Sequence, residues 1–283
     1  NGNQTSQDAN DYIHITHSIE AQDMAESGWN YTSASSYITL SFWAKASTAQ
    51  TMYVKVGASD ASRTFTFAFS ATTSWTKITK TIAGNSNLAF NNDNGVGIAL
   101  YFIPFYGTNY TTSGHSNDSW IADSSSNQVT DMTTTWYTTD DATFEITGVQ
   151  LEVGSVATPF EHRAVGDDLT RCKRYYEQFN SEGLSEAPFG VGYFESDTQL
   201  RAVVPLHEKR ADVSFSSTAA STFASMNTNN MPAGSSISLY KTGKKAAIIL
   251  LTLGSSVTSG DGRAGILCAQ SSTEATLKFD SEL

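Results

Sequence analysis

Aromatic side chains set among amide, hydroxyl and acid groups are the residues of this chain best suited to holding a ligand. They gather in the polar segment 107–141 and at the end of the apolar run before it. Sugars present apolar C–H faces that stack on aromatic rings, and hydroxyls that need polar partners. The pattern therefore predicts a glycan site, with the candidates Tyr106, Tyr110, His115 and Trp120. The alternative is that these rings clamp a long loop onto the domain or meet a neighbouring subunit.

Trp43 is a second candidate ring for binding a glycan. It falls on the polar face of an alternating run, away from the apolar residues of the same run. If residues 38–46 and 52–56 form a hairpin, Lys55 would lie opposite Trp43 and stack on its ring. Burial of Trp43 at an interface is the alternative.

The sequence has no motif for enzymatic chemistry. It contains no Gly-x-Ser-x-Gly elbow and no glycine cluster with the spacing of a nucleotide-binding loop. A glycosidase needs two carboxyl groups facing each other, but neighbours such as Asp140 and Asp141 point apart on a strand. We interpret that pair as part of a loop, and Asp167-Asp168 as the start of a helix. We therefore expect a protein that is not an enzyme.

Metal and cofactor sites are not expected either. His14 and His17 are three residues apart on a predicted strand, so their side chains project to opposite faces. Cys172 and Cys268 lie far apart in apolar surroundings, without disulfide or metal-ligand spacing. The many Asp and Asn residues allow a structural calcium ion without specifying its ligands.

Charge and hydropathy exclude two classes of partner. The 283 residues carry a net charge of −11, and residues 1–160 hold 14 acidic and 5 basic groups, against 14 and 12 in residues 161–283. This acidic chain lacks the basic face that a phosphate backbone attracts, so no nucleic acid is expected. The longest strongly apolar run, at residues 246–253, is far shorter than the roughly 20 residues of a membrane-spanning helix. Membrane insertion is therefore not expected.

Alternation of apolar and polar residues predicts strands over most of the chain. The clearest lie at residues 37–45, 52–56, 64–69, 75–82, 96–105 and 143–153. We expect an all-β protein, with an N-terminal jelly-roll β-sandwich over 1–163 and a smaller C-terminal β-sandwich over 185–283. A short connector helix is expected within 164–184, after the acidic pair at 167–168.

The predicted helix has an apolar stripe at intervals of three, four and three residues, formed by Leu169, Cys172, Tyr176 and Phe179. This spacing is that of a coiled-coil seam, but a helix of about a dozen residues is not stable alone in water. The stripe must therefore pack on the β domains or on other copies. We expect it to join three copies on one axis, as a homotrimer.

Two segments resemble a known family. The first is ITGVQLEVGSVATPFEHR at residues 146–163, and the second is DLTRCKRYYE at residues 168–177. Together they resemble a signature of tail-fibre and other virion fibre proteins of tailed phages, particularly phages of marine bacteria. In that family the first segment closes a jelly-roll domain similar to family 4/9 carbohydrate-binding modules.

The resemblance implies a virion fibre protein that attaches to the host surface. Its expected partners are a host cell-surface glycan and other virion proteins, and it would act outside the cell as part of the virion. The first alternative is a purely structural fibre or capsid-bound appendage without glycan binding. The second is a polysaccharide depolymerase.

Overall fold

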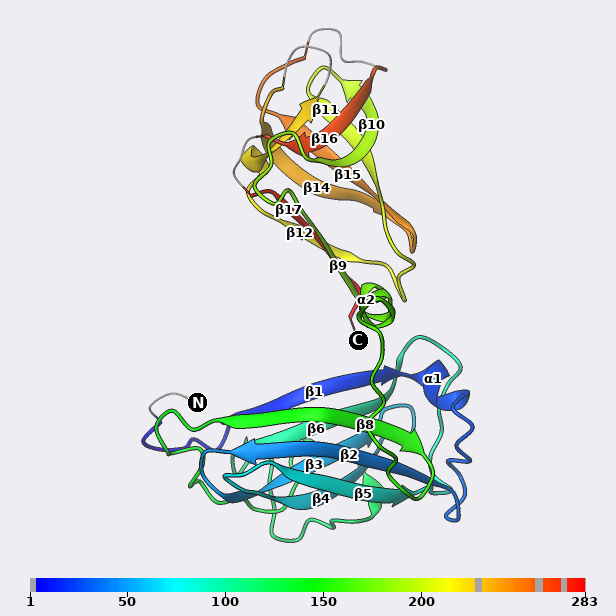
Figure 1. Ribbon diagram of the computed structural model, residues 1–283, viewed down its shortest axis with the longest axis vertical. Coiled ribbons are helices and arrows are strands. Elements are labelled where there is room, and N and C mark those ends of the chain that lie inside the picture. Colours follow the sequence, from blue (N-terminus) through cyan, green and yellow to red (C-terminus); the bar gives the residue numbers. More distant parts are fainter. Residues whose placement is uncertain (1–3, 227–230, 258–261, 271–273, 283) are drawn as a thin grey trace. The chain divides into compact units, whose positions relative to one another are not determined.

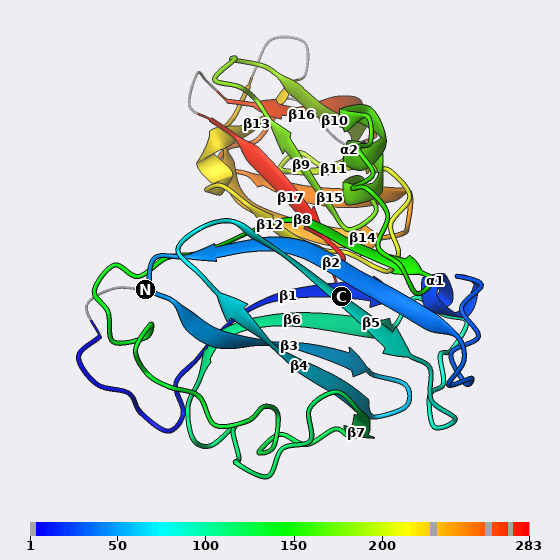
Figure 2. The same cartoon turned by 60° about the horizontal axis from the view of Figure 1, so that its bottom comes forward.

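The protein forms two compact β units, seen in the computed structural model shown in Figures 1 and 2. The structure describes residues 4–226, 231–257, 262–270 and 274–282. One unit spans residues 1–162 and the other spans residues 163–282. Strands make up most of the regular secondary structure of both units, which confirms the prediction of an all-β protein.

The N-terminal unit is a jelly-roll-like sandwich of two antiparallel sheets. The strand order is β1-β6-β3-β4-β7 in one sheet and β5-β2-β8 in the other, and both layers can be followed in Figure 2. The five-stranded sheet contains β1 (Tyr12–Glu20), β3 (Gln50–Ala58), β4 (Arg63–Ala71), β6 (Val96–Tyr106) and β7 (Trp120–Ala122). The other contains β2 (Tyr37–Ala46), β5 (Thr76–Ala83) and β8 (Phe144–Val153), and a short helix α1 (Ala21–Ala25) follows β1.

The core between these sheets is formed by the apolar faces of the alternating strands. Phe42 of β2 meets Phe69 of β4 and Phe102 of β6 edge-on, at ring-centroid distances of 5.4 and 5.1 Å. All three rings are buried, as the alternation predicts. Removing a ring as well packed as Phe42 typically costs about 3–5 kcal/mol of stability.

Strands β2 and β3 do not form a hairpin. β2 pairs with β5 and β8, whereas β3 pairs with β4 and β6 in the opposite sheet. The chain crosses from one sheet to the other between Ala46 and Gln50. The predicted pairing of Lys55 with Trp43 is therefore wrong, because successive strands of this sandwich can belong to different layers.

The C-terminal unit is a second β-sandwich. Its larger sheet has the order β13-β16-β10-β11-β15-β14 and its smaller sheet the order β12-β17-β9. The larger contains β10 (Pro188–Ser196), β11 (Gln199–Pro205), β13 (Phe223–Met226), β14 (Gly234–Thr242), β15 (Ala246–Leu253) and β16 (Ala264–Ala269). The smaller contains β9 (Tyr176–Asn180), β12 (Ser214–Ser217) and β17 (Thr276–Asp280), and a single helical turn η1 (Ala220–Thr222) precedes β13. Phe194, Phe223 and Phe279 are fully buried between the sheets.

The predicted helical stripe is wrong in its second half. Helix α2 (Val165–Lys173) ends before Tyr176 and Phe179, which lie in strand β9. Phe179 packs against Phe279 with ring centroids 6.0 Å apart, because β9 pairs with β17 along its whole length. Leu169 is 52% exposed and Cys172 is an exposed free thiol. Residues 176–180 were expected in the connector but belong to a sheet of the C-terminal unit.

Candidate functional site

A bulge in β6 decides which way Tyr106 points. The register between β1 and β6 shifts in this region, so that β6 has one residue more than its partner. Pro104 lies in the irregular stretch, where a residue without an N–H group is tolerated. Tyr106 consequently shares an outer cluster with Tyr101, whereas Phe102 faces the core. Regular alternation would have turned Tyr106 inward with Phe102.

A hollow of about 270 Å³ opens on the outer face of the five-stranded sheet. It is lined by Tyr12, His14, Tyr101, Tyr106, Tyr110 and Gln128. Tyr12 stacks on His14 with ring centroids 5.4 Å apart, and Tyr110 meets Tyr12 edge-on at 5.6 Å. Tyr12 is 57% exposed and Tyr106 only 4%, so the first forms the rim and the second the floor. We call this site the tyrosine hollow.

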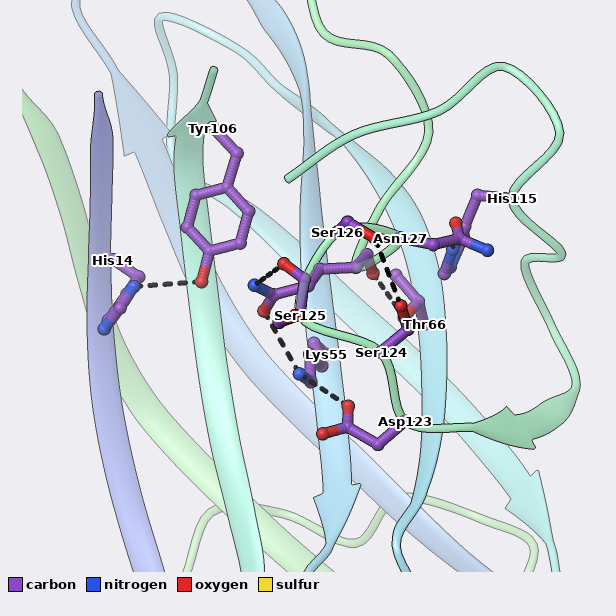
Figure 3. Close-up of polar contacts among 11 residues, drawn as sticks. His14, Lys55, Thr66, Tyr106, His115, Asp123, Ser124, Ser125, Ser126 and Asn127 are labelled. Carbon is purple, nitrogen blue, oxygen red and sulfur yellow. Dashed lines mark hydrogen bonds and ion pairs between the residues drawn. The ribbon is translucent and has the colours of Figure 1, made fainter. Parts of the chain in front are cut away.

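Two polar groups are joined at the floor of the tyrosine hollow. The hydroxyl of Tyr106 lies 2.9 Å from Nδ1 of His14, as Figure 3 shows. Burial lowers the pKa of His14, and the charge of Lys55 lowers it further. Burial also raises the pKa of Tyr106. The Tyr106 hydroxyl can donate to Nδ1 or accept from it, and in a neutral imidazole Nε2 then offers a ligand the role that Nδ1 does not take.

A second hollow of about 240 Å³ shares Tyr101 with the first. Its lining includes Lys55, whose ammonium lies 2.8 Å from Oδ1 of Asp123 and 3.1 Å from Oε1 of Gln128 (Figure 3). The same ammonium is 5.3 Å from the centre of the Tyr101 ring. The buried Lys55 is thus held by a carboxylate, an amide and an aromatic face, which together offset its desolvation.

The polar segment 107–131 forms a wall of these hollows instead of an open loop. The hydroxyl of Thr66 donates to the carbonyl of Gln128 at 3.3 Å, and the N–H of Asp118 donates to the carbonyl of Thr66 at 2.7 Å. Strand β7 also lies within the segment and pairs with β4. Figure 3 shows part of the segment, with Asp123 and Asn127, passing in front of the strands.

The structure places the predicted glycan residues in different environments. Tyr106 and Tyr110 line the tyrosine hollow. His115 is buried, with Nδ1 2.9 Å from Oδ1 of Asn127. Trp120 lies 5.6 Å from the ring of Phe65 and lines a separate hollow of about 370 Å³.

Trp120 also fastens its segment to the sandwich. Its Nε1–H donates to the carbonyl of Ala83 on β5 at 2.8 Å. Together with the packing on Phe65, this bond ties β7 to both sheets. The contacts of Trp120 are those of a ring that clamps the segment, which is the alternative the sequence leaves open.

Trp43 lies apart from the tyrosine hollow, on the sheet that contains β2, and is 41% exposed. It stands opposite a bulge in β8, where Gly148 has a φ of +59°. A Cβ at Gly148 would lie 3.4 Å from the Trp43 ring. The ammonium of Lys45 lies 5.4 Å from the centre of the Trp75 ring, and the ammonium of Lys55 lies over Tyr101, not over Trp43.

The run 146–163 folds back on itself. The side-chain oxygen of Gln150 accepts from the N–H of Glu161 at 2.8 Å, and the carboxylate of Glu152 accepts from the N–H of Thr158 at 3.1 Å. Gln150 also donates to Glu152, and this bond is the main reason that the pKa of Glu152 is lowered. These bonds tie residues 158 and 161 to the last residues of β8. Residues 146–163, which resemble the phage fibre proteins, therefore hold the end of this strand in place.

Sequence reasoning missed most of the tyrosine hollow. Tyr12 and His14 alternate on one face of β1, and this period of two was the available signal. No comparable sequence pattern marks Tyr101 and Gln128 as part of the site. They meet the other lining residues because of the β6 bulge and the path of segment 107–131.

Two kinds of feature, metal sites and membrane-spanning helices, can be judged in residues 4–226, 231–257, 262–270 and 274–282. Within these ranges, no group of three or more His, Cys, Asp and Glu side chains is placed to hold a metal ion. In the same part of the chain, no helix is long and apolar enough to cross a membrane.

Comparison with known proteins gives no family assignment. No protein-family model and no curated protein matches the chain. Among solved structures, a chain described as Red Clover Necrotic Mosaic Virus is similar at 8% identity and a TM-score of 0.17, covering 98% of this chain and 87% of that chain. At this TM-score the similarity carries no argument about fold or function.

Proposed function

We propose that this protein is a non-enzymatic fibre protein of a phage virion that attaches to the host surface by binding a glycan in the tyrosine hollow. The observation that carries the proposal is the grouping of four tyrosines around His14 and Gln128 on one open face. Exposed rings suit the C–H faces of sugars, and imidazole and amide groups suit their hydroxyls.

The charge of the N-terminal unit narrows the class of glycan. Residues 1–162 carry 15 acidic and 5 basic side chains. A strongly anionic polysaccharide would be repelled by this unit, since like charges disfavour encounter. A neutral or amino sugar meets no such barrier, and Asp123 beside Lys55 offers both an acceptor and a donor close to the rings.

The virion part of the proposal is supported by the resemblance of residues 146–163 and 168–177 to phage fibre proteins. Other virion proteins would then be partners, and the protein would act outside the cell. Several copies in one fibre, as a homotrimer, would multiply weak sugar contacts through effective concentration.

The test is binding of the purified protein to host cells and to their isolated surface polysaccharide. Tyr12→Ala is expected to weaken binding about fivefold, because a stacked ring contributes on the order of 1 kcal/mol. Trp43→Ala is the matched control, since it removes an exposed ring from the other sheet. Unchanged binding by the Tyr12 variant would overturn the assignment of the site, and release of reducing sugar would overturn the non-enzymatic assignment.

A purely structural fibre or capsid-bound appendage is the second candidate. It is favoured because the side chains of Trp120 and His115 are hydrogen-bonded to other residues of the same unit. Incorporation into particles, together with no binding to host cells or polysaccharide, would support this candidate over the first.

A further inference from the structure

The outer face of the six-stranded sheet in the C-terminal unit has an apolar row at its centre. A row of side chains crosses four neighbouring strands, each residue directly opposite the next: Ile266, Val191, Val203 and Ile248. Val191 and Val203, at its centre, are 64% and 44% exposed. Exposed Tyr193 and Tyr240 and half-buried Leu250 extend the apolar area. We call this surface the valine face.

The sequence of β15 also indicates that this face of the sheet is covered. The strand reads AAIILLTL, the longest strongly apolar run of the chain. Ile249 and Leu251 are buried inside the unit, whereas Ile248 and Leu250 belong to the other side of the strand. A strand that is apolar on both sides is typical of sheets covered on both faces. The sandwich itself covers only one face of β15.

The charges favour a second copy of this chain as the covering partner. On the valine face, the guanidinium of Arg201 pairs with Glu195 and lies 3.9 Å from the centre of the Tyr240 ring. Residues 163–282 carry 13 acidic and 12 basic side chains, whereas residues 1–162 carry 15 and 5. Copies therefore repel each other through their N-terminal units but not through their C-terminal units.

The size of the face is also suitable. The six strands have four to nine residues each, and at about 3.3 Å per residue and about 4.8 Å between strands they give a footprint of roughly 700 Å². A stable interface buries on the order of 800 Å² per partner.

We infer that the valine face is an interface between copies of this chain. The inference deepens the assembly part of the proposed function, and its test requires no glycan. Sedimentation velocity of the full chain over a wide concentration range is expected to show an oligomer. The double variant Val191→Glu/Val203→Glu is expected to dissociate at least tenfold more readily, because buried like charges face each other across the contact.

Leu184→Glu is the matched control, since Leu184 is an exposed apolar residue of the same unit outside the sheet. It should leave the mass unchanged. Val191→Thr/Val203→Thr keeps the β-branched shape and tests the same contact if the glutamate variant does not fold. A monomeric parent protein, or valine variants that associate as tightly as the parent, would overturn the inference. If the parent protein forms the oligomer but binds no glycan, the result would count against the proposed function and not against this interface.

Discussion

The ammonium of Lys209 lies 3.2 Å from Oε2 of Glu177, and both side chains are buried in the C-terminal unit. The same ammonium donates to the carbonyl of Lys173, the last residue of α2, at 2.5 Å. Glu177 also accepts from the N–H of His207 at 3.0 Å. The pair thus joins strand β9, the end of the helix and the segment after β11.

Breaking this pair from one side should be strongly destabilising. Lys209→Met removes the ammonium from the buried Glu177 carboxylate and leaves it the N–H and imidazole of His207, and breaking a buried pair from one side typically costs about 3–5 kcal/mol. Urea unfolding of the C-terminal unit measures the loss. The double variant Glu177→Gln/Lys209→Met should lose less than the sum of the single variants, since the two sites are coupled. Additive losses would show that the pair is not a unit.

The pKa of His14 should be lower than that of a solvent-exposed histidine. Burial, and then the charge of Lys55, hold its pKa below the ordinary value of about 6.5. Folding therefore favours the neutral imidazole, so the stability it contributes is present above pH 6.5 and is lost as the pH falls through the folded-state pKa. NMR titration should place the midpoint of His14 below 6.5, with His14→Gln identifying the signal. A midpoint at or above 6.5 would contradict this environment.

Trp120 should matter for stability more than for binding. Trp120→Ala removes the ring that packs on Phe65 and leaves the carbonyl of Ala83 without its donor. We expect a loss of about 2–4 kcal/mol in the N-terminal unit. Thermal unfolding monitors it, with Trp43→Ala, a partly exposed ring, expected to cost less than about 1 kcal/mol. Weakened glycan binding at an unchanged Tm would instead make Trp120 a ligand contact.

The bulge in β8 should require glycine. Gly148→Ala places a side chain at a φ of +59° and against the Trp43 ring, and left-handed backbone costs about 1–2 kcal/mol for a residue with a Cβ. Gly114→Ala is the control, because open space surrounds that position and its φ is outside the left-handed range. Equal unfolding midpoints of the two variants in urea would show that the bulge adapts without strain.

Alternation in the sequence predicted most strands of the N-terminal unit, but not β7 (Trp120–Ala122), which lies in the polar segment. Phe42 and Phe102 face the core as their periods require. Which strands pair with each other could not be predicted in this way, because the period of a strand does not show which of the two sheets it joins. For this reason Lys55 was expected opposite Trp43 but lies in the other sheet.

The secondary structure of short segments whose apolar spacing fits both a helix and a strand could not be predicted from the sequence. Tyr176 and Phe179 fit a helical spacing, yet pairing with β17 makes them part of a strand. Tyr106 was recognised as a candidate ring, but its companions Tyr12 and His14 were not. Their meeting depends on the extra residue in β6, which alternation alone does not reveal.

That extra residue allows one strand to serve both faces of its sheet. Phe102 and Phe105 are three residues apart, so in a regular strand one of them would point away from the core. With the bulge both rings lie in the core, and Tyr106, the residue after Phe105, lies on the outer side with Tyr101. A change of register that removed the bulge at constant chain length would turn Phe105 out of the core and Tyr106 into it, so the same inserted position determines both the packing of the sandwich and the floor of the hollow.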